Sequence, residues 1–281
     1  MTPPAMIATT EAYGFTFAYP AGDLTVGTSL REFGEFGRVG STIAAELARG
    51  AVFVDVGANI GAYALPVSRD AARVIAIEAH PGLAGLLARN VAENGLGNIE
   101  IIAAAAGPAA GEVAFPTADL GEHRNFGSLS LARGAKATAP TPMVRLDDVA
   151  PADTRLVKID VEGFEPAVLA GATRLRAEVR PYWMVELDGD GPQGRALVRD
   201  FQVAGYRTWW LYDPFVTPRA PRGDWRRAFG RGDLSLLAAP AEAEQPSGMV
   251  EAVGEDYAWA TNTQGFDYLA RFDFPAWNPR T

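Results

Sequence analysis

Residues 52–61 read Val52-Phe-Val-Asp55-Val-Gly57-Ala-Asn59-Ile-Gly61. The apolar start of this stretch predicts a buried strand that ends at Asp55, and the two glycines predict a turn leading into a helix. A strand, a glycine turn and a helix N-terminus in this order are typical of a site for a nucleotide cofactor. The stretch therefore predicts an α/β fold that binds its cofactor at the carboxyl end of this strand.

Asp55 helps to distinguish between two classes of cofactor. A dinucleotide site places pyrophosphate on the glycine turn and carries the pattern G-x-G-x-x-G. Here the spacing is D-x-G-x-x-x-G, and the carboxylate of Asp55 would repel a pyrophosphate. The same carboxylate would attract the ammonium and sulfonium groups of S-adenosylmethionine. We therefore expect S-adenosylmethionine as the cofactor and a methyltransferase as the class of enzyme.

The composition limits the possible partners and compartments. With 281 residues, 48% of them hydrophobic, the chain is long enough to bury a full core. The net charge of −9 disfavours a broad surface for nucleic acid or anionic membranes, so we expect neither partner. The lack of cysteine excludes disulfides, thiolate metal sites and cysteine nucleophiles. Without a membrane-length apolar run or a signal-like N-terminus, the sequence predicts a bacterial-type cytoplasmic enzyme.

Beyond residue 61 the chain alternates between strand-like and helix-like patterns. Strands are expected at 52–55, 74–77, 99–105, 156–160, 182–187, 206–211 and 234–238. Helices are expected at 41–49, from about 59, at 81–93, up to 170 and at 196–204. This alternation predicts a doubly wound, mostly parallel sheet.

Three regions follow from the same patterns. Residues 1–50 are expected to form an N-terminal preface of short strands and a helix, and residues 51–240 the cofactor-binding domain. Residues 241–281 are rich in aromatic side chains and are expected to form an arm or a lid, with a possible role in homo-oligomer contacts.

Glu78 is a second candidate for a cofactor contact. It follows the predicted strand at 74–77 and lies 17 residues after Gly61. In open α/β folds this position faces the ribose of the cofactor, where a carboxylate can accept hydrogen bonds from both hydroxyls. The alternative is that Glu78 only ends the strand or caps the helix that follows.

Three segments resemble the FkbM family of S-adenosylmethionine-dependent methyltransferases: Asp55-Val-Gly-Ala-Asn-Ile-Gly61, Glu78-Ala-His-Pro81 and Lys158-Ile-Asp160-Val-Glu162-Gly-Phe-Glu165. The resemblance covers roughly residues 50–190. It implies the class I methyltransferase (Rossmann-like) fold, in which the last strand runs antiparallel. It also implies O-methylation of a hydroxyl on a sugar, glycoside, polyketide or related small metabolite. By motif match, the cofactor-loop role falls to Asp55, Gly57, Asn59 and Gly61, and the ribose role to Glu78.

The third segment supplies the candidates for the chemistry of the acceptor. A hydroxyl acceptor must lose its proton, and a positioned base assists that step. Lys158, Asp160 and Glu162 alternate with period two, so they share one face if the strand continues to Glu162. Asp160 is our first candidate as a base, as an orienting group for the acceptor, or as a contact to the methionine end of the cofactor. Glu162 is the second, although an acid there also suits the first turn of a helix.

Two further residues are weaker candidates for the same site. Glu186 ends the predicted strand at 182–187, next to the strand of Asp160, and could complete an acidic acceptor site. His123 lies in a polar loop and could act as a base, or it could simply be solvated. A divalent metal held by Asp160, Glu186 and His123 is conceivable, but no spacing requires it, and we expect no metal.

An aromatic and basic segment follows residue 208. Aromatic rings bind sugars well, and neighbouring arginines could hold an anionic group of an acceptor. Core packing or a subunit interface would explain the same residues, which are Trp209, Trp210, Tyr212, Phe215, Arg219, Arg222, Trp225, Arg226, Arg227 and Phe229.

Three functions therefore remain in play. The leading one is an O-methyltransferase that acts on a small hydroxylated acceptor. An NAD-dependent oxidoreductase is disfavoured by Asp55, by the glycine spacing and by the lack of a Tyr-x-x-x-Lys pair. A non-catalytic protein that keeps the methyltransferase fold for binding is the third.

Overall fold

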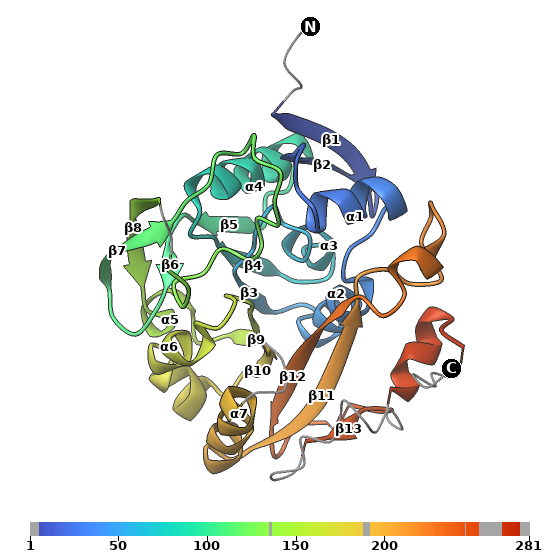
Figure 1. Cartoon of the computed structure of the whole chain (residues 1–281). Helices are drawn as coiled ribbons and strands as arrows, with labels where there is room; N and C mark the ends of the chain where they lie inside the picture. The colour runs from blue at the N-terminus through green and yellow to red at the C-terminus, as the bar shows by residue number, and fades with distance from the viewer. Residues whose placement is uncertain (1–5, 135–136, 188–191, 245, 253–265, 276–281) are drawn as a thin grey trace, which may run out of the picture.

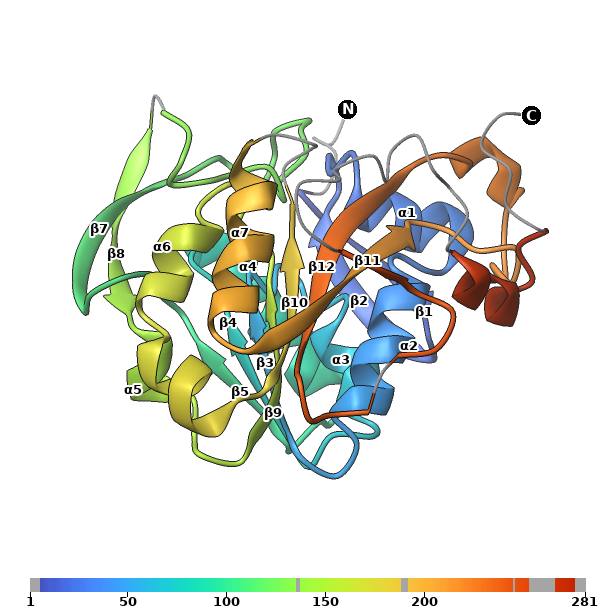
Figure 2. The same cartoon turned by 90° about the horizontal axis from the view of Figure 1, so that it is seen from below.

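The computed structural model of the chain shows a large central sheet with helices on both of its faces (Figure 1). It describes residues 6–134, 137–187, 192–244, 246–252 and 266–275. Figure 2 shows α2 (Arg38–Leu47) and α3 (Ala64–Val67) on one face of the sheet, and α6 (Glu165–Ala170) and α7 (Pro192–Val203) on the other. The α/β fold predicted from the sequence is confirmed.

Within the described residues the central sheet has eight strands in the order β13-β11-β12-β10-β9-β3-β4-β5. The strands from β10 to β5 are parallel to one another, whereas β12 lies antiparallel between β10 and β11. The antiparallel last long strand agrees with the family resemblance. The bounds are β3 (Val52–Val56), β4 (Arg73–Ile77), β5 (Ile99–Ile102), β9 (Thr154–Ile159), β10 (Tyr182–Glu186), β11 (Tyr206–Pro214), β12 (Gly232–Pro240) and β13 (Val250–Glu251).

β3 is buried along its whole length, as expected for a parallel strand covered on both faces.

The remaining helices are short or lie at the edges of the sheet. Helix α4 begins at Pro81 and ends before Asn94, as predicted. The other helical segments are α1 (Val26–Phe33), α4 (Pro81–Glu93), α5 (Leu146–Val149), the π-helical η1 (Leu175–Val179), and the 3₁₀ segments η2 (Trp225–Ala228) and η4 (Asp267–Phe272).

Two of the predicted elements differ from the structure. The helix expected from about residue 59 begins only at Ala64. The reason is that Gly57, Asn59 and Gly61 all have positive φ angles, so the chain makes left-handed turns before it can enter a helix. The strand expected at 99–105 ends at Ile102, and the chain then enters a separate three-stranded sheet formed by β6 (Ala105–Ala106), β8 (Thr138–Val144) and β7 (Gly111–Pro116).

The N-terminal hairpin is attached to the central domain by a buried asparagine. β1 (Ile7–Ala12) and β2 (Phe15–Pro20) pair antiparallel. The side chain of Asn90 in α4 accepts a hydrogen bond from the Ala18 amide at 2.7 Å and donates one to the Ala18 carbonyl at 3.1 Å. The main apolar core extends from Ala12 to Phe274, and a small second cluster consists of Phe33, Val216 and Ala228. The division into 1–50, 51–240 and 241–281 stays a prediction.

The described part of the C-terminal region packs against the antiparallel end of the sheet. The Tyr268 hydroxyl in η4 donates to the Tyr212 carbonyl and accepts from the Tyr212 amide, both at 2.7 Å. The described tail residues do not line the main cavity, which lies at the carboxyl ends of β3, β4, β9 and β10. Among the described helices, none is long and apolar enough to cross a membrane.

Candidate active site

A cavity of about 1100 Å³, including its open mouth, lies at the carboxyl ends of β3, β4, β9 and β10. This is the place where open α/β sheets bind their ligands. It brings the two predicted motifs together across one space, although they are about a hundred residues apart. The predicted site residues on its wall are Asp55, Gly57, Asn59, Glu78, Lys158, Asp160, Glu162 and Glu186.

Two predicted site residues do not line this cavity. Gly61 lies behind the loop, where a Cβ atom would meet the side chains of Leu65 and Leu87 at 2.4 and 2.8 Å. The lack of a side chain at Gly61 therefore lets the loop pack closely against α3 and α4. His123 lies on an exposed stretch of loop, away from the cavity wall. The structure gives no support to its role as a base.

Gly57 joins the cofactor loop to the acidic segment. Its φ angle is +81°, and a Cβ atom there would lie only 1.9 Å from the carbonyl oxygen of Asp160. The amide of Asp160 in turn donates to the carbonyl of Val56 at 3.0 Å. The position of Asp160 relative to the loop thus depends on a residue without a side chain.

We expect Gly57→Ala to lower the free energy of unfolding by about 2–4 kcal/mol, because the substitution adds both a clash and a left-handed backbone strain. Gly85→Ala is the matched control. Gly85 lies inside α4, and a Cβ atom there meets nothing within 4 Å. The control should gain about 0.5–1 kcal/mol. Urea denaturation of both variants measures the difference, and equal midpoints would show that the loop has room to move.

Asp55 is a buried carboxyl group with unsatisfied oxygens. It is 1% exposed, and neither oxygen has a hydrogen-bond partner among the described residues. The ammonium of Lys158 lies 4.0 Å from one oxygen. Burial raises the pKa of Asp55 to about 6, although Lys158 acts to lower it. A carboxylate in this state suits a cationic ligand group in the cavity.

Glu78 stabilises the loop and still faces the cavity. Its two carboxylate oxygens accept from the amides of Asn59 and His80, each at 2.8 Å. His80, and not Glu78, caps α4, because its Nδ1 accepts from the amides of Gly82 and Leu83. Burial raises the pKa of Glu78 to about 7 against the effect of these hydrogen bonds. Its place at the end of β4 fits the predicted contact to a ribose.

Lys158, Asp160 and Glu186 form the charged centre of the adjoining wall, beside Asp55. The Lys158 ammonium donates to the Asp160 carboxylate at 2.8 Å. Burial acts to raise the pKa of Asp160, but Lys158 and a hydrogen bond from Glu186 outweigh it and leave that pKa below its ordinary value. Burial and the charge of Asp160 raise the pKa of Glu186 well above its usual range. The two carboxyl groups therefore share one proton and titrate as a pair.

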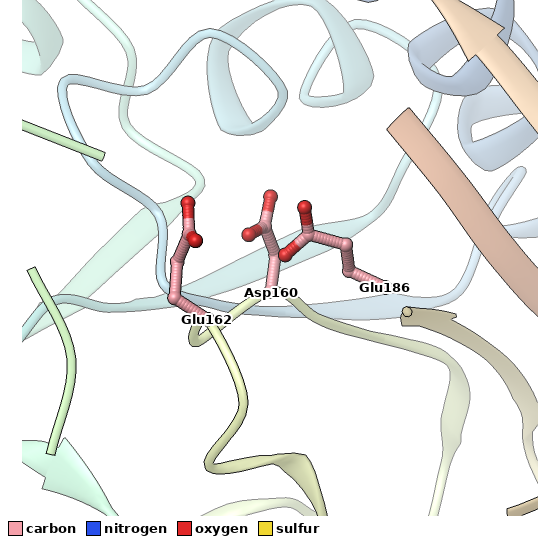
Figure 3. Close-up of side chains that lie close together, drawn as sticks. All are labelled: Asp160, Glu162 and Glu186. Atoms are coloured by element: carbon pink, nitrogen blue, oxygen red, sulfur yellow. The ribbon is translucent and has the colours of Figure 1, made fainter. Parts of the chain in front are cut away.

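The predicted strand face is only partly correct. β9 ends at Ile159, and Glu162 has a left-handed φ of 56°, so the strand does not continue to Glu162. The backbone nevertheless turns so that the carboxyl groups of Asp160, Glu162 and Glu186 point to the same side (Figure 3). One oxygen from each lies within 4.8 Å of the others. Three carboxylate oxygens at this spacing could hold a hard cation such as Mg²⁺, although acidic groups of this kind also occur without one.

Sequence reasoning missed a hydrogen-bonded pair that supports Lys158. The ring of Tyr63 lines the cavity, and its centroid lies 4.7 Å from the Lys158 ammonium. The Tyr63 hydroxyl donates to Asp213 on β11, and Asp213 also accepts from the amide of Gly40 in α2 at 2.9 Å. Asp160 was chosen from the sequence because it is an acid within an apolar strand. Asp213 shows the same pattern and could have been chosen in the same way.

The chain matches the Methyltransferase FkbM domain family over residues 55–208, which is just over half of its length. The chain belongs to the FkbM methyltransferase family. The resemblance seen in the sequence is therefore confirmed, and the matched range includes each of the ten predicted site residues. No curated protein matches the chain.

Solved structures of similar fold include several methyltransferases. A methyltransferase FkbM from Methylobacillus flagellatus KT is 20% identical, with a TM-score of 0.43, and the match covers 67% of this chain and 43% of that one. M. jannaschii TYW2 in complex with AdoMet is 14% identical, with a TM-score of 0.45, and the match covers 85% of this chain and 87% of that one. The aTrm5 chain in a complex with tRNALeu is 14% identical, with a TM-score of 0.44, and the match covers 85% of this chain and 54% of that one.

Similarity at this level concerns the fold and identifies no substrate. The chain spans less than half of the Methylobacillus protein, so the activity of that whole protein is not transferred to this one. The expected lack of a nucleic-acid partner stays a prediction. The possible homo-oligomer and the cytoplasmic location also stay predictions.

Proposed function

We propose that this member of the FkbM family is an S-adenosylmethionine-dependent O-methyltransferase for a hydroxyl on a sugar, glycoside, polyketide or related small metabolite. One observation carries the proposal. A single cavity has a glycine loop with Asp55 and Glu78 on the wall at the ends of β3 and β4, and the Lys158–Asp160–Glu186 centre on the adjoining wall at the ends of β9 and β10. The first wall suits a cationic nucleoside, and the second suits a hydroxyl that must lose a proton.

The residues of the first wall fit the proposed cofactor. Asp55 would hold a cationic group of S-adenosylmethionine, because its oxygens lack hydrogen-bond partners among the described residues and Lys158 approaches one of them only to 4.0 Å. Glu78 would accept hydrogen bonds from the ribose hydroxyls, and the positive φ angles of Gly57 and Asn59 shape the loop beside them. When bound, S-adenosylmethionine supplies a methyl group that its sulfonium has already activated. The protein then needs mainly to align the acceptor and to remove water.

The residues of the second wall would bind the acceptor hydroxyl and take up its proton. Lys158 keeps Asp160 ionised, so Asp160 can accept a hydrogen bond from the hydroxyl and orient it. The proton would pass to the carboxyl pair of Asp160 and Glu186 once Glu186 has lost its own. Glu162 is the second candidate on this wall. We assign no role to His123.

Calorimetric titration with S-adenosylmethionine, S-adenosylhomocysteine and NAD tests the proposed cofactor directly. We expect binding of the first two and none of NAD. Glu78→Gln keeps the shape of the side chain but removes its charge, and it should weaken binding of S-adenosylhomocysteine by about tenfold or more. The exposed Glu100→Gln on β5 is the matched control and should bind as the wild type does.

Other results of the binding and transfer experiments would favour a different function or a different acceptor atom. Binding of NAD alone would favour an oxidoreductase and would overturn the proposal. Binding of S-adenosylmethionine without methyl transfer to any hydroxylated acceptor would favour a non-catalytic binding protein. Methyl transfer to a nitrogen atom would keep the cofactor and overturn the proposed O-methylation.

A further inference from the structure

A second hollow lies beside the main cavity. It has an open volume of about 450 Å³ and lies between α1 and the segment that joins β11 to β12. Figure 1 shows this joining segment, in orange, next to α1. Thr25 and Phe215 line both spaces, so the hollow and the main cavity adjoin at these two residues. A ligand that reaches past these two side chains would occupy both spaces.

The two spaces differ in the sign of their charge. The main cavity carries one lysine against six carboxyl groups, namely those of Asp55, Glu78, Asp160, Glu162, Glu186 and Asp233. The second hollow carries Arg227 and Arg231 against the single acid Glu32. The main cavity therefore suits a cation, whereas the hollow beside it suits an anion.

Arg231 is the residue that gives the hollow its excess of positive charge. Its guanidinium lies 5.6 Å from the centroid of the Phe215 ring, and that ring packs against Phe36 at 4.9 Å. The carbonyl of Arg231 accepts from the Phe215 amide at 3.0 Å, which fixes the two residues side by side. Within the part of the chain that the structure describes, its guanidinium forms no ion pair. A stacked guanidinium without an acid keeps its donors for a ligand.

The other arginines of this segment have partners in the protein. Trp225, which sequence reasoning placed among them, packs against Phe229 and Phe274 and not on the cavity wall. The observed partners are Asp273 for Arg219, the carbonyls of Glu11 and Leu30 for Arg222, Asp224 for Arg226 and Glu32 for Arg227. Arg231 was not among the residues singled out from the sequence.

We propose that the second hollow binds an anionic group of the methyl acceptor, a carboxylate or a phosphate, through Arg231. The acceptor hydroxyl would then lie on the other side of Phe215, in the main cavity near Asp160. This inference rests on the proposed function and narrows its substrate class to small molecules that carry both a hydroxyl and an anionic group. A guanidinium binds either anion through two parallel hydrogen bonds.

Four simple probes test the inference: glucose, glucuronate, glucose 6-phosphate and inorganic phosphate. Each is titrated into the protein saturated with S-adenosylhomocysteine, and binding is followed by calorimetry at low salt. We expect at least one anionic probe to bind about tenfold or more tightly than glucose. Arg231→Met, which keeps an apolar stem over Phe215, should remove this preference.

Arg226→Met is the matched control, because Arg226 lies on the same surface but lines neither space and already pairs with Asp224. It should keep the preference for an anion. The inference is overturned if all anionic probes bind no better than glucose, or if Arg231→Met keeps the preference. Failure of the proposed function gives a different result. S-adenosylhomocysteine would then not bind, whereas the cofactor-free protein would still prefer anionic probes and lose that preference in Arg231→Met.

Discussion

Asp160→Asn is expected to lower the rate of methyl transfer by about 10²–10⁴-fold. The substitution keeps the size of the side chain but removes the charge that Lys158 stabilises at 2.8 Å. It thereby removes the group that we expect to orient the acceptor hydroxyl and to share its proton with Glu186. Single-turnover transfer from radiolabelled S-adenosylmethionine measures the rate apart from product release.

The affinity for S-adenosylhomocysteine distinguishes this effect from general damage. It should stay within about threefold of the wild-type value in Asp160→Asn, since Asp55 and Glu78 remain in place. Glu162→Gln is the comparison variant, because Glu162 is 22% exposed and pairs with Arg133. We expect less than about a tenfold loss of rate there. A wild-type rate of methyl transfer in Asp160→Asn would show that the carboxyl pair of Asp160 and Glu186 takes no part in the reaction.

The pH dependence of the rate provides a second measure of the same pair. The raised pKa of Glu186 means that the pair holds its shared proton well above the ordinary range of a carboxyl group. Only the form without this proton can act as a base. The rate should therefore rise with pH as the proton leaves, and Glu186→Gln should remove the rise. A pH profile unchanged by Glu186→Gln would assign the base elsewhere.

The positions of the strands and of most site residues could be predicted because they follow from local rules. An apolar run followed by an acid, as in residues 52–55, predicts both a buried strand and a polar group at its carboxyl end. Parallel strands place such ends at one edge of the sheet. Asp55, Glu78, Asp160 and Glu186 meet in one cavity for this reason, although they are distributed over more than 130 residues.

What the sequence did not predict depends on backbone turns and on distant contacts. The helix was expected from about residue 59, but Asn59 and Gly61 have positive φ angles, and Gly57 before them packs closely on Asp160. The contact between Tyr63 and Asp213 joins residues 150 positions apart, and no local pattern indicates it. Arg231 was overlooked for a similar reason. Its importance comes from the lack of an ion pair to its guanidinium among the described residues, which composition does not show.

Asp55→Asn is expected to weaken the binding of S-adenosylhomocysteine by about 10–100-fold and, at the same time, to make the ligand-free protein more stable at pH 8. The loss of affinity follows from removing the carboxylate that we expect to hold a cationic group of the cofactor. The gain in stability follows because this carboxylate is 1% exposed and its oxygens accept no hydrogen bond from the residues that the structure describes. An amide of the same shape avoids the cost of burying that charge.

The dependence on pH fixes the sign of this stability effect. Burial raises the pKa of Asp55 from 3.8 to about 6 in the folded protein, so folding favours its protonated form. The destabilising contribution of the ionised group is therefore fully present above pH 6, and it disappears as the pH falls toward 3.8. The melting temperature of Asp55→Asn should exceed that of the wild type by several degrees at pH 8 and by less at pH 5. A variant that melts below the wild type at pH 8 yet binds S-adenosylhomocysteine normally would show that Asp55 is a structural partner of Lys158. A stable variant with weak binding would show that the buried charge of Asp55 destabilises the folded protein and is needed to bind the cofactor.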